Sequence, residues 1–344
     1  MWQDSFHKPV IVLALFAFGM TIIPINDALI KLMSAYLSLG QIMFVRAIFS
    51  IIIVMLFSRG ISKMFTLPAQ VFWLFVGRGM CIVVAMISFF AALGSLPLAI
   101  AISIFFVSPL FITLLSVPFL GETIGIHRAI AVSIGLVGMI VIIQPGGDEF
   151  RPETLLVVLS AFSYAMCQIW TRRLSGMGDL ATMVSVQQIC YLVVGGLLVI
   201  MNIFTQRPDS DNPTIDFLLR VPATASLMDY LFILICGISV LLLSVTSAHA
   251  YRVLEASVIA PFEYVAIPSG IFWGMLIWDE WPETSAWIGM FLILVGGLYM
   301  VFRERARDVD VTLSSPMPAA AAASQNFDFD EEDTDGINKD DSDK

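Results

Sequence analysis

Four ionisable side chains fall inside long apolar stretches of this chain, where a charge is costly and tends to be kept for a function. They are Asp27, Arg46, Arg78 and Glu263. An arginine at such depth can bind the carboxylate or phosphate of a small molecule, and a carboxylate can bind an amine or carry a proton. These residue types therefore predict a polar site enclosed by apolar helices.

Each of the four also has a purely structural interpretation. Asp27 stands four residues before Lys31, so the two can pair at a helix end. Arg78 can extend its head group towards the membrane surface. Arg46 lies too deep for that, so we expect a partner or a cavity for it. Glu263 can bind a cationic group, carry a proton or form an internal ion pair with Arg46 or Arg78, and the sequence leaves these three open.

Neutral polar side chains accompany these charges. Gln187 and Gln188 are adjacent, so at most one of them can face a given point of a site. Tyr164 and Gln168 share one helix face, and Tyr264 directly follows Glu263. Hydrogen bonds between helices and contact with a bound molecule both explain such residues. The candidate substrate-binding residues are therefore Asp27, Arg46, Arg78, Gln187, Glu263 and Tyr264.

The elements that must position these residues are ten apolar stretches, each about as long as a helix that crosses a bilayer. Of the 344 residues, 58% are hydrophobic and only 13% are charged, whereas a soluble domain has about 25% charged residues. We expect an all-α polytopic membrane protein that has the lipid bilayer as a partner. The predicted spans are 9–33, 39–58, 69–93, 97–119, 127–144, 153–175, 181–203, 227–252, 256–278 and 284–302.

The two halves of the chain resemble each other. Leu15 to Phe18 matches Leu159 to Phe162, and Glu122 matches Glu280 in its position after the fourth stretch of each half. Because each half has an odd number of spans, the second must insert upside down relative to the first. This predicts two inverted five-helix repeats, at 9–144 and 153–303, the architecture of a secondary transporter.

Charge is distributed unevenly along the chain. Of the net charge of −10, residues 308–344 carry −9, from nine Asp, two Glu and two Lys. That composition predicts a disordered acidic tail. The predicted loops place ten Lys or Arg residues on the side of the N-terminus and four on the other side. We therefore expect a multi-pass protein of the bacterial inner membrane with both termini in the cytoplasm.

Motifs of soluble catalysis are absent from the sequence. It contains no Walker A loop, no HExxH and no GxSxG, and its three histidines are scattered. All four cysteines fall in apolar stretches without CxxC spacing. We expect no enzymatic activity, no metal, no cofactor and no nucleic-acid partner.

Two related segments resemble the drug/metabolite transporter superfamily, EamA type. One runs through 96–101 and 109–111 to Leu120-Gly121-Glu122, and the other runs from 254–264 to Asp279-Glu280. The resemblance covers about residues 9–303, and Arg46 and Arg78 match positions where that family often has arginine. Asn26-Asp27 and 153–173 make the chain similar to the branch with S-adenosylmethionine and riboflavin carriers.

The resemblance implies a ten-helix carrier whose first four helices in each half line a cavity and whose fifth helices are peripheral. Its members move amino acids, nucleotide-like metabolites, vitamins or toxic organic compounds. We expect a secondary transporter of a small metabolite that works by alternating access, and a zwitterionic substrate fits the mixture of charges. The alternative is a membrane sensor or adaptor that acts through the acidic tail. The sequence leaves the oligomeric state open.

Overall fold

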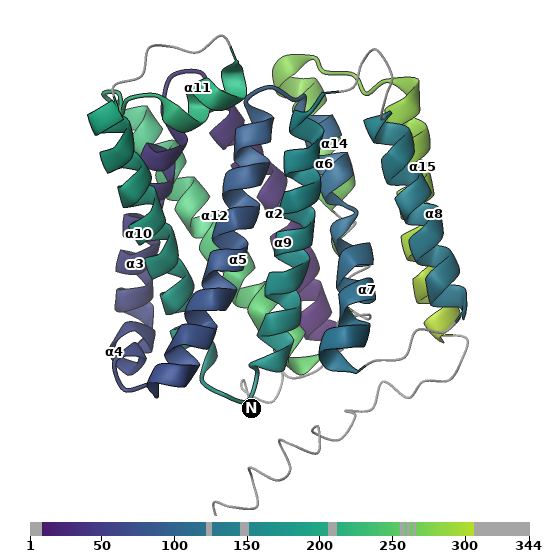
Figure 1. Ribbon diagram of the computed structural model, residues 1–344, viewed down its shortest axis with the longest axis horizontal. Coiled ribbons are helices and arrows are strands. Elements are labelled where there is room, and N and C mark those ends of the chain that lie inside the picture. The colour runs from purple at the N-terminus through teal and green to yellow at the C-terminus, as the bar shows by residue number, and fades with distance from the viewer. Residues whose placement is uncertain are drawn as a thin grey trace, which may run out of the picture. The chain divides into compact units, whose positions relative to one another are not determined.

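Long helices run side by side through the described part of the chain (Figure 1). The computed structural model describes residues 9–121, 126–144, 151–205, 212–254, 259, 262–263 and 266–305. These residues contain no β-strand and belong to one compact unit, so the all-α class is confirmed for them. The predicted tail at 308–344 lies outside the described residues.

Seven apolar segments of the described residues are long enough to cross a membrane. Each matches a predicted span to within a few residues, and the seven make the chain a multi-pass membrane protein. They are α2 (Pro9–Met33), α3 (Leu39–Phe57), α5 (Ala69–Leu93), α6 (Leu98–Phe105) together with α7 (Ser108–Leu120), α9 (Glu153–Arg173), α10 (Leu180–Thr205) and α12 (Leu227–Val253).

The other three predicted spans contain helices with shorter described apolar parts: α8 (Ile126–Ile143), α14 (Ala266–Trp278) and α15 (Thr284–Arg305). The prediction of one continuous helix over 256–278 is wrong at its beginning. Helix α14 begins only at Ala266, and Glu263 lies in a 3₁₀ turn before it. Pro268 is in the first turn of α14, where its missing N–H removes no helical hydrogen bond.

The predicted span 97–119 is likewise divided into α6 and α7. Pro109 lies in the first turn of α7 and cannot donate a hydrogen bond to the preceding turn, so a helix tends to break just before it. Gly121 ends α7 with a φ of 71°, a left-handed conformation that glycine adopts without a steric penalty.

Two short helices mark opposite ends of the bundle in Figure 1, α4 (Gly60–Met64) at the lower edge and α11 (Pro213–Leu219) at the upper edge. The 19 residues of α3 separate these ends by about 28 Å at 1.5 Å per residue. Asn212 caps α11 by accepting hydrogen bonds from the backbone N–H groups of Thr214 and Ile215.

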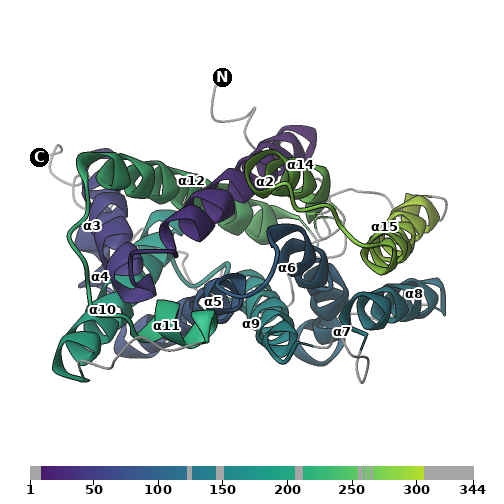
Figure 2. The same cartoon turned by 90° about the horizontal axis from the view of Figure 1, so that it is seen from above.

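Helices α8 and α15 pack against each other at one side of the bundle (Figure 2). A Cβ added to Gly138 would lie 2.7 Å from the carbonyl oxygen of Gly289, so the two backbones approach closely. Elsewhere α2 packs against α12 and α14, α3 against α10, and α5 against α9. This arrangement surrounds a central cavity and leaves α8 and α15 outside it.

Candidate functional site

A cavity of about 140 Å³ lies between helices from the first and second halves of the sequence. Its described lining comes from α2, α3, α5, α6, α9, α10 and α12, together with Phe106 and Ala266, and includes no residue of α8 or α15. The resemblance implies the same division between lining and peripheral helices. A cavity of this volume accommodates a group about the size of a benzene ring.

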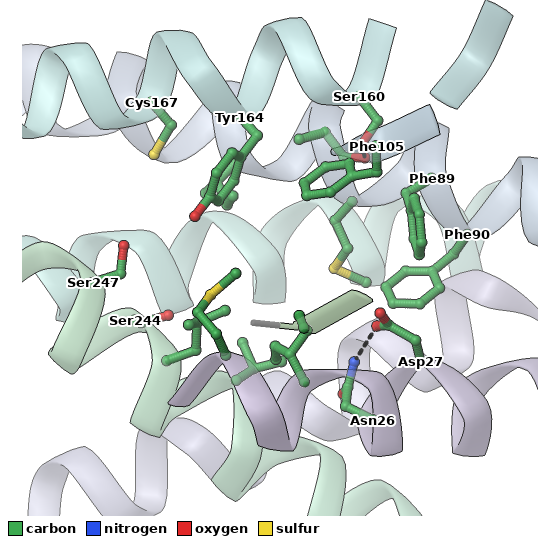
Figure 3. Close-up of a pocket in the computed structure, with 18 of the residues that line it drawn as sticks. Asn26, Asp27, Phe89, Phe90, Phe105, Ser160, Tyr164, Cys167, Ser244 and Ser247 are labelled. Carbon is green, nitrogen blue, oxygen red and sulfur yellow. Dashed lines mark hydrogen bonds between the residues drawn. The ribbon is translucent and has the colours of Figure 1, made fainter. Parts of the chain in front are cut away.

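Aromatic rings form much of one wall. Phe89 contacts Phe90 and Phe105, each with ring centroids 5.4 Å apart, and Phe105 contacts Tyr164 at 5.3 Å. Figure 3 shows these rings facing the cavity, with Asp27 beside Phe90 at one end and Ser244 and Ser247 towards the other. Such a wall suits an apolar body, a planar ring or a cation over a ring face.

Asp27 lines this cavity from α2, and its Oδ1 accepts a hydrogen bond of 2.9 Å from Asn26. The structural interpretation in which Asp27 pairs with Lys31 is wrong. The Lys31 Nζ lies 2.6 Å from Glu280 Oε1 and 4.8 Å from the centre of the Trp278 ring, because α14 ends beside this part of α2. No Lys, Arg or His within the described ranges forms an ion pair with Asp27, so this carboxyl group can receive a cationic ligand.

Arg46 is 2% exposed and lines the cavity from α3. Its Nη2 contacts the sulfur of Met86, and its guanidinium lies 5.2 Å from the centre of the Tyr191 ring. Among the described residues its Nη1 has no hydrogen-bond partner. Buried donors are nearly always satisfied, so an unpaired one in a cavity is available to an anionic group of a ligand.

Arg78 is 3% exposed and is directed inward from α5. Its Nε donates to Thr171 Oγ1 at 2.6 Å and its Nη1 donates to Gln187 Oε1 at 2.9 Å. The interpretation that Arg78 extends to the membrane surface is therefore wrong. Gln187 donates in turn to Ser244 and lines the cavity, whereas Gln188 is absent from the described lining, as their adjacency predicts.

Glu263 is fully buried and lies behind Tyr164 rather than in the cavity lining. Its Oε1 accepts hydrogen bonds from the hydroxyls of Tyr164 at 3.0 Å and Tyr251 at 2.8 Å, and its Oε2 accepts one from Ser108 at 3.4 Å. The alternative of an ion pair with Arg46 or Arg78 is wrong. Tyr264, the remaining candidate, lies outside the described residues.

Sequence reasoning missed several residues of this network, notably Ser108, Thr171 and Tyr251. Serine and threonine are common in membrane helices, and nothing local relates Tyr251 to Glu263 across the break before α14. The spacing of Ser244 and Ser247 does predict that they lie on one helix face, because residues three apart share a face. Both line the cavity, and Ser247 accepts a hydrogen bond of 2.8 Å from Gln168.

Residues 10–144 match the EamA-like transporter family. The chain carries an EamA-like domain. This match confirms the EamA resemblance for residues 10–144. The similar proteins include an S-adenosylmethionine carrier and a riboflavin carrier, the two kinds named in the sequence analysis. A solved crystal structure shares the fold of this chain, with a TM-score of 0.60 at 17% identity, covering 86% of this chain and 98% of the other.

Several proteins similar to this chain are named as transporters. The S-adenosylmethionine uptake transporter of Rickettsia bellii is 26% identical over 280 residues, which are 81% of this chain and 89% of the relative. The pseudopaline exporter CntI of Pseudomonas aeruginosa is 27% identical over 285 residues, 83% and 92% of the two chains. The riboflavin transporter of Vibrio cholerae is 28% identical over 199 residues, 58% and 61% of the two chains.

Proposed function

We propose that this protein is a secondary transporter that carries a small metabolite across the bacterial inner membrane by alternating access. The observation that carries the proposal is one buried cavity that holds both Asp27 and the unpaired Nη1 of Arg46. Buried charges without protein partners are costly, and a cavity that opens to water or to a charged substrate removes that cost. The transporter names of the relatives support the same class.

The proposal takes the chain as two inverted five-helix repeats, 9–144 and 153–303, with both termini in the cytoplasm. It is supported by the sequence likeness of the halves and by helices within all ten predicted spans. The cavity draws its lining from both halves, which supports a substrate site where the two proposed repeats meet.

Alternating access requires contacts between the halves that can form at one end while they break at the other. Two ion pairs connect the halves near opposite ends of α3. Lys31 pairs with Glu280, whose Oε2 also accepts a hydrogen bond of 2.9 Å from the backbone N–H of Leu98. Lys63 of α4 pairs with Asp179 at 2.6 Å. Each pair can be broken without disturbing the hydrophobic core.

The substrate we propose is zwitterionic and has an apolar or ring-bearing body. In this arrangement Asp27 receives an amine or another cationic group, and Arg46 receives a carboxylate. Arg78 and Gln187 then support the polar end of the site, and the rings from Phe89 to Tyr164 contact the body of the substrate. Amino-acid-like compounds fit this distribution of charge.

Uptake into proteoliposomes tests the proposal. The purified protein is reconstituted and offered labelled amino acids, riboflavin and S-adenosylmethionine, with and without a proton gradient. We expect saturable accumulation of one compound, and Asp27→Asn and Arg46→Gln should each raise the concentration needed for half-saturation. Asp279→Asn and Arg59→Gln are matched controls, because these residues are exposed and lie outside the cavity lining.

Failure of the folded protein to accumulate any of these compounds would contradict the proposal for this range of substrates. Truncation after Arg307 separates it from the sensor or adaptor alternative. A carrier keeps its uptake without residues 308–344, whereas a protein that acts through its tail loses its effect.

A further inference from the structure

We propose that Glu263 is a proton-binding site, whose protonation is communicated to the cavity through the hydroxyl of Tyr164. Glu263 then takes up and releases one proton in each cycle. The coupling to substrate rests on the proposed function, but the proton binding itself does not, and the two can be tested separately.

Among the described residues, the Glu263 carboxyl group is hydrogen-bonded only by neutral groups. Glu263 is 0% exposed, and every hydrogen bond to it within the described residues comes from a neutral hydroxyl: Tyr164 and Tyr251 on Oε1, and Ser108 on Oε2. Three donors can hold the ionised form, but none of them neutralises its charge. A carboxylate in a low-dielectric interior without a cation is costly, and a proton is the smallest group that removes the charge.

The described helices around Glu263 provide no ion-pair partner for it. Helix α7 contributes no charged residue. On α9 the nearby titratable groups are Tyr164 and Cys167, and Figure 3 shows the two close together. Helix α2 presents Phe16, whose ring packs edge-on against Tyr251.

Helix α12 has two basic residues near Tyr251. Arg252, the next residue, donates to the backbone carbonyls of Ser175 and Gly178. His249 is two residues away from Tyr251, on the opposite side of α12. No ion pair joins either residue to Glu263 within the described part of the chain.

Tyr164 connects Glu263 to the cavity. Of the three donors, only Tyr164 belongs to the described cavity lining. When Glu263 is ionised, the Tyr164 hydroxyl donates a hydrogen bond to the carboxylate. When Glu263 is protonated, its own O–H becomes a donor, so the Tyr164 hydroxyl can accept from it and donate towards the cavity instead. The polarity presented to a substrate therefore changes with the protonation of a residue that the substrate does not touch.

The position of Ser108 makes the hydrogen bonding of Glu263 depend on how the two halves of the chain are arranged. Ser108 begins α7 directly after the break between α6 and α7 and belongs to the first half of the chain, whereas Tyr164, Tyr251 and Glu263 belong to the second. A movement of the halves that separates Ser108 from Glu263 removes one of the three donors that hold the carboxylate. Loss of a donor favours proton uptake in one conformation and release in the other.

The simpler alternative is a structural cluster, in which Glu263 connects α7, α9 and α12 and never changes its protonation state. Infrared difference spectroscopy separates the two, because only a protonated carboxyl group gives the carbonyl-stretch band of a carboxylic acid. The full-length protein in liposomes is titrated between mildly alkaline and mildly acidic pH without any substrate. The variants are Glu263→Gln, Asp27→Asn, Tyr164→Phe and the exposed control Glu283→Gln.

We expect a carboxylic-acid band that grows as the pH falls, disappears in Glu263→Gln, and persists in Asp27→Asn and Glu283→Gln. In Tyr164→Phe the band should shift in frequency, because the carboxyl group has lost one hydrogen-bond partner. Identical titrations of the wild type and folded Glu263→Gln would overturn the proposal. If Glu263→Gln does not elute as a folded species, an unshifted band in folded Tyr164→Phe would overturn it instead.

A transport arm tests the coupling separately, with whichever labelled compound of the uptake panel the wild type accumulates. Wild-type uptake should depend on the proton gradient, and Glu263→Gln uptake should not. A Glu263→Gln variant that still responds to the gradient as the wild type does would overturn the coupling, even if the infrared band is lost. A wild type that accumulates nothing contradicts the transporter proposal and leaves the infrared result to decide on proton binding.

Discussion

Asp27 and Glu263 are both buried carboxyl groups, but their surroundings differ. Asp27 lines the cavity and accepts one hydrogen bond, from Asn26. Glu263 is separated from the cavity by Tyr164 and accepts hydrogen bonds from three hydroxyls. A carboxyl group that faces a cavity can be neutralised by a cationic ligand, whereas one enclosed by hydroxyls has room only for a proton. This difference is the basis on which we propose substrate binding for Asp27 and proton binding for Glu263.

The largest effect should come from Asp27→Asn. Truncating one partner of a buried charge pair costs about 2–5 kcal/mol, so half-saturation for the transported compound should rise on the order of thirtyfold or more. Concentration-dependent uptake into proteoliposomes measures this, with Asp279→Asn as the control. Equal half-saturation concentrations in Asp27→Asn and the wild type would show that Asp27 does not bind the substrate.

Glu263→Gln should have a different and smaller effect. One proton moved down a gradient of about one pH unit supplies about 1.4 kcal/mol, enough for roughly tenfold accumulation. The variant should lose this driven accumulation and keep exchange of labelled for unlabelled compound across the membrane. The comparison of accumulation with exchange is the measurement, and loss of both together would show that Glu263 is needed for more than proton binding.

The ion pair between Lys31 and Glu280 gives a third, intermediate test at one end of the cavity. These side chains are 12% and 24% exposed, and a hydrogen bond to a charged group contributes about 1.5 kcal/mol or more. Glu280→Gln should therefore open this end roughly tenfold more often. We expect a cysteine placed at Ser244 to react faster with a membrane-impermeant thiol reagent applied from that side, with peptide mass spectrometry separating it from the four native cysteines.

An unchanged rate for that cysteine in Glu280→Gln would show that the pair does not close the cavity. The same reagent applied from the other side serves as the internal reference, because breaking this pair should not open the opposite end.

The smallest effect is expected for Lys63 and Asp179, which lie outside the spanning helices and are 60% and 37% exposed. Partial burial acts to raise the pKa of Asp179, but hydrogen bonds from Lys63 and Thr182 outweigh it and hold the pKa below the usual 3.8. At neutral pH solvent screening limits the contribution to less than about 1 kcal/mol.

The pKa of Asp179 is lower in the folded state than in the unfolded state. The ion pair therefore stabilises the fold when the pH is above the unfolded-state pKa, and this stabilisation disappears as the pH falls through the folded-state pKa. Asp179→Asn should therefore be slightly less heat-stable than the wild type at neutral pH and equally stable in strong acid. Thermal unfolding in detergent at several pH values measures the difference, and a difference that does not change with pH would exclude the ion pair as its cause.

The positions of the helices could be predicted from the sequence because their signal is local. A long apolar stretch must form its backbone hydrogen bonds internally, so α2, α3 and α5 lie where hydropathy places them. Charge at membrane depth is equally local, and it identified Arg46 and Arg78 as residues that must face the interior.

The partners of the charged residues could not be predicted in the same way. A helix periodicity pairs Asp27 with Lys31, but the packing of α2 against α14 brings Glu280 to Lys31 from 249 residues away. Tyr251 donates a hydrogen bond to Glu263, which lies twelve residues further along the chain and outside α12. Such contacts depend on how the helices pack, and no single stretch of sequence predicts that packing.

We propose above that the cavity holding Asp27 and Arg46 is the substrate site. Protection of a cysteine at Ser244 from alkylation tests it most directly, with a cysteine at the exposed position Thr205 as the control. We expect the transported compound to slow alkylation of the cysteine at position 244 over the same concentration range that saturates uptake. The cysteine at position 205 should react at an unchanged rate. Saturable uptake with no protection at 244 would contradict the proposal.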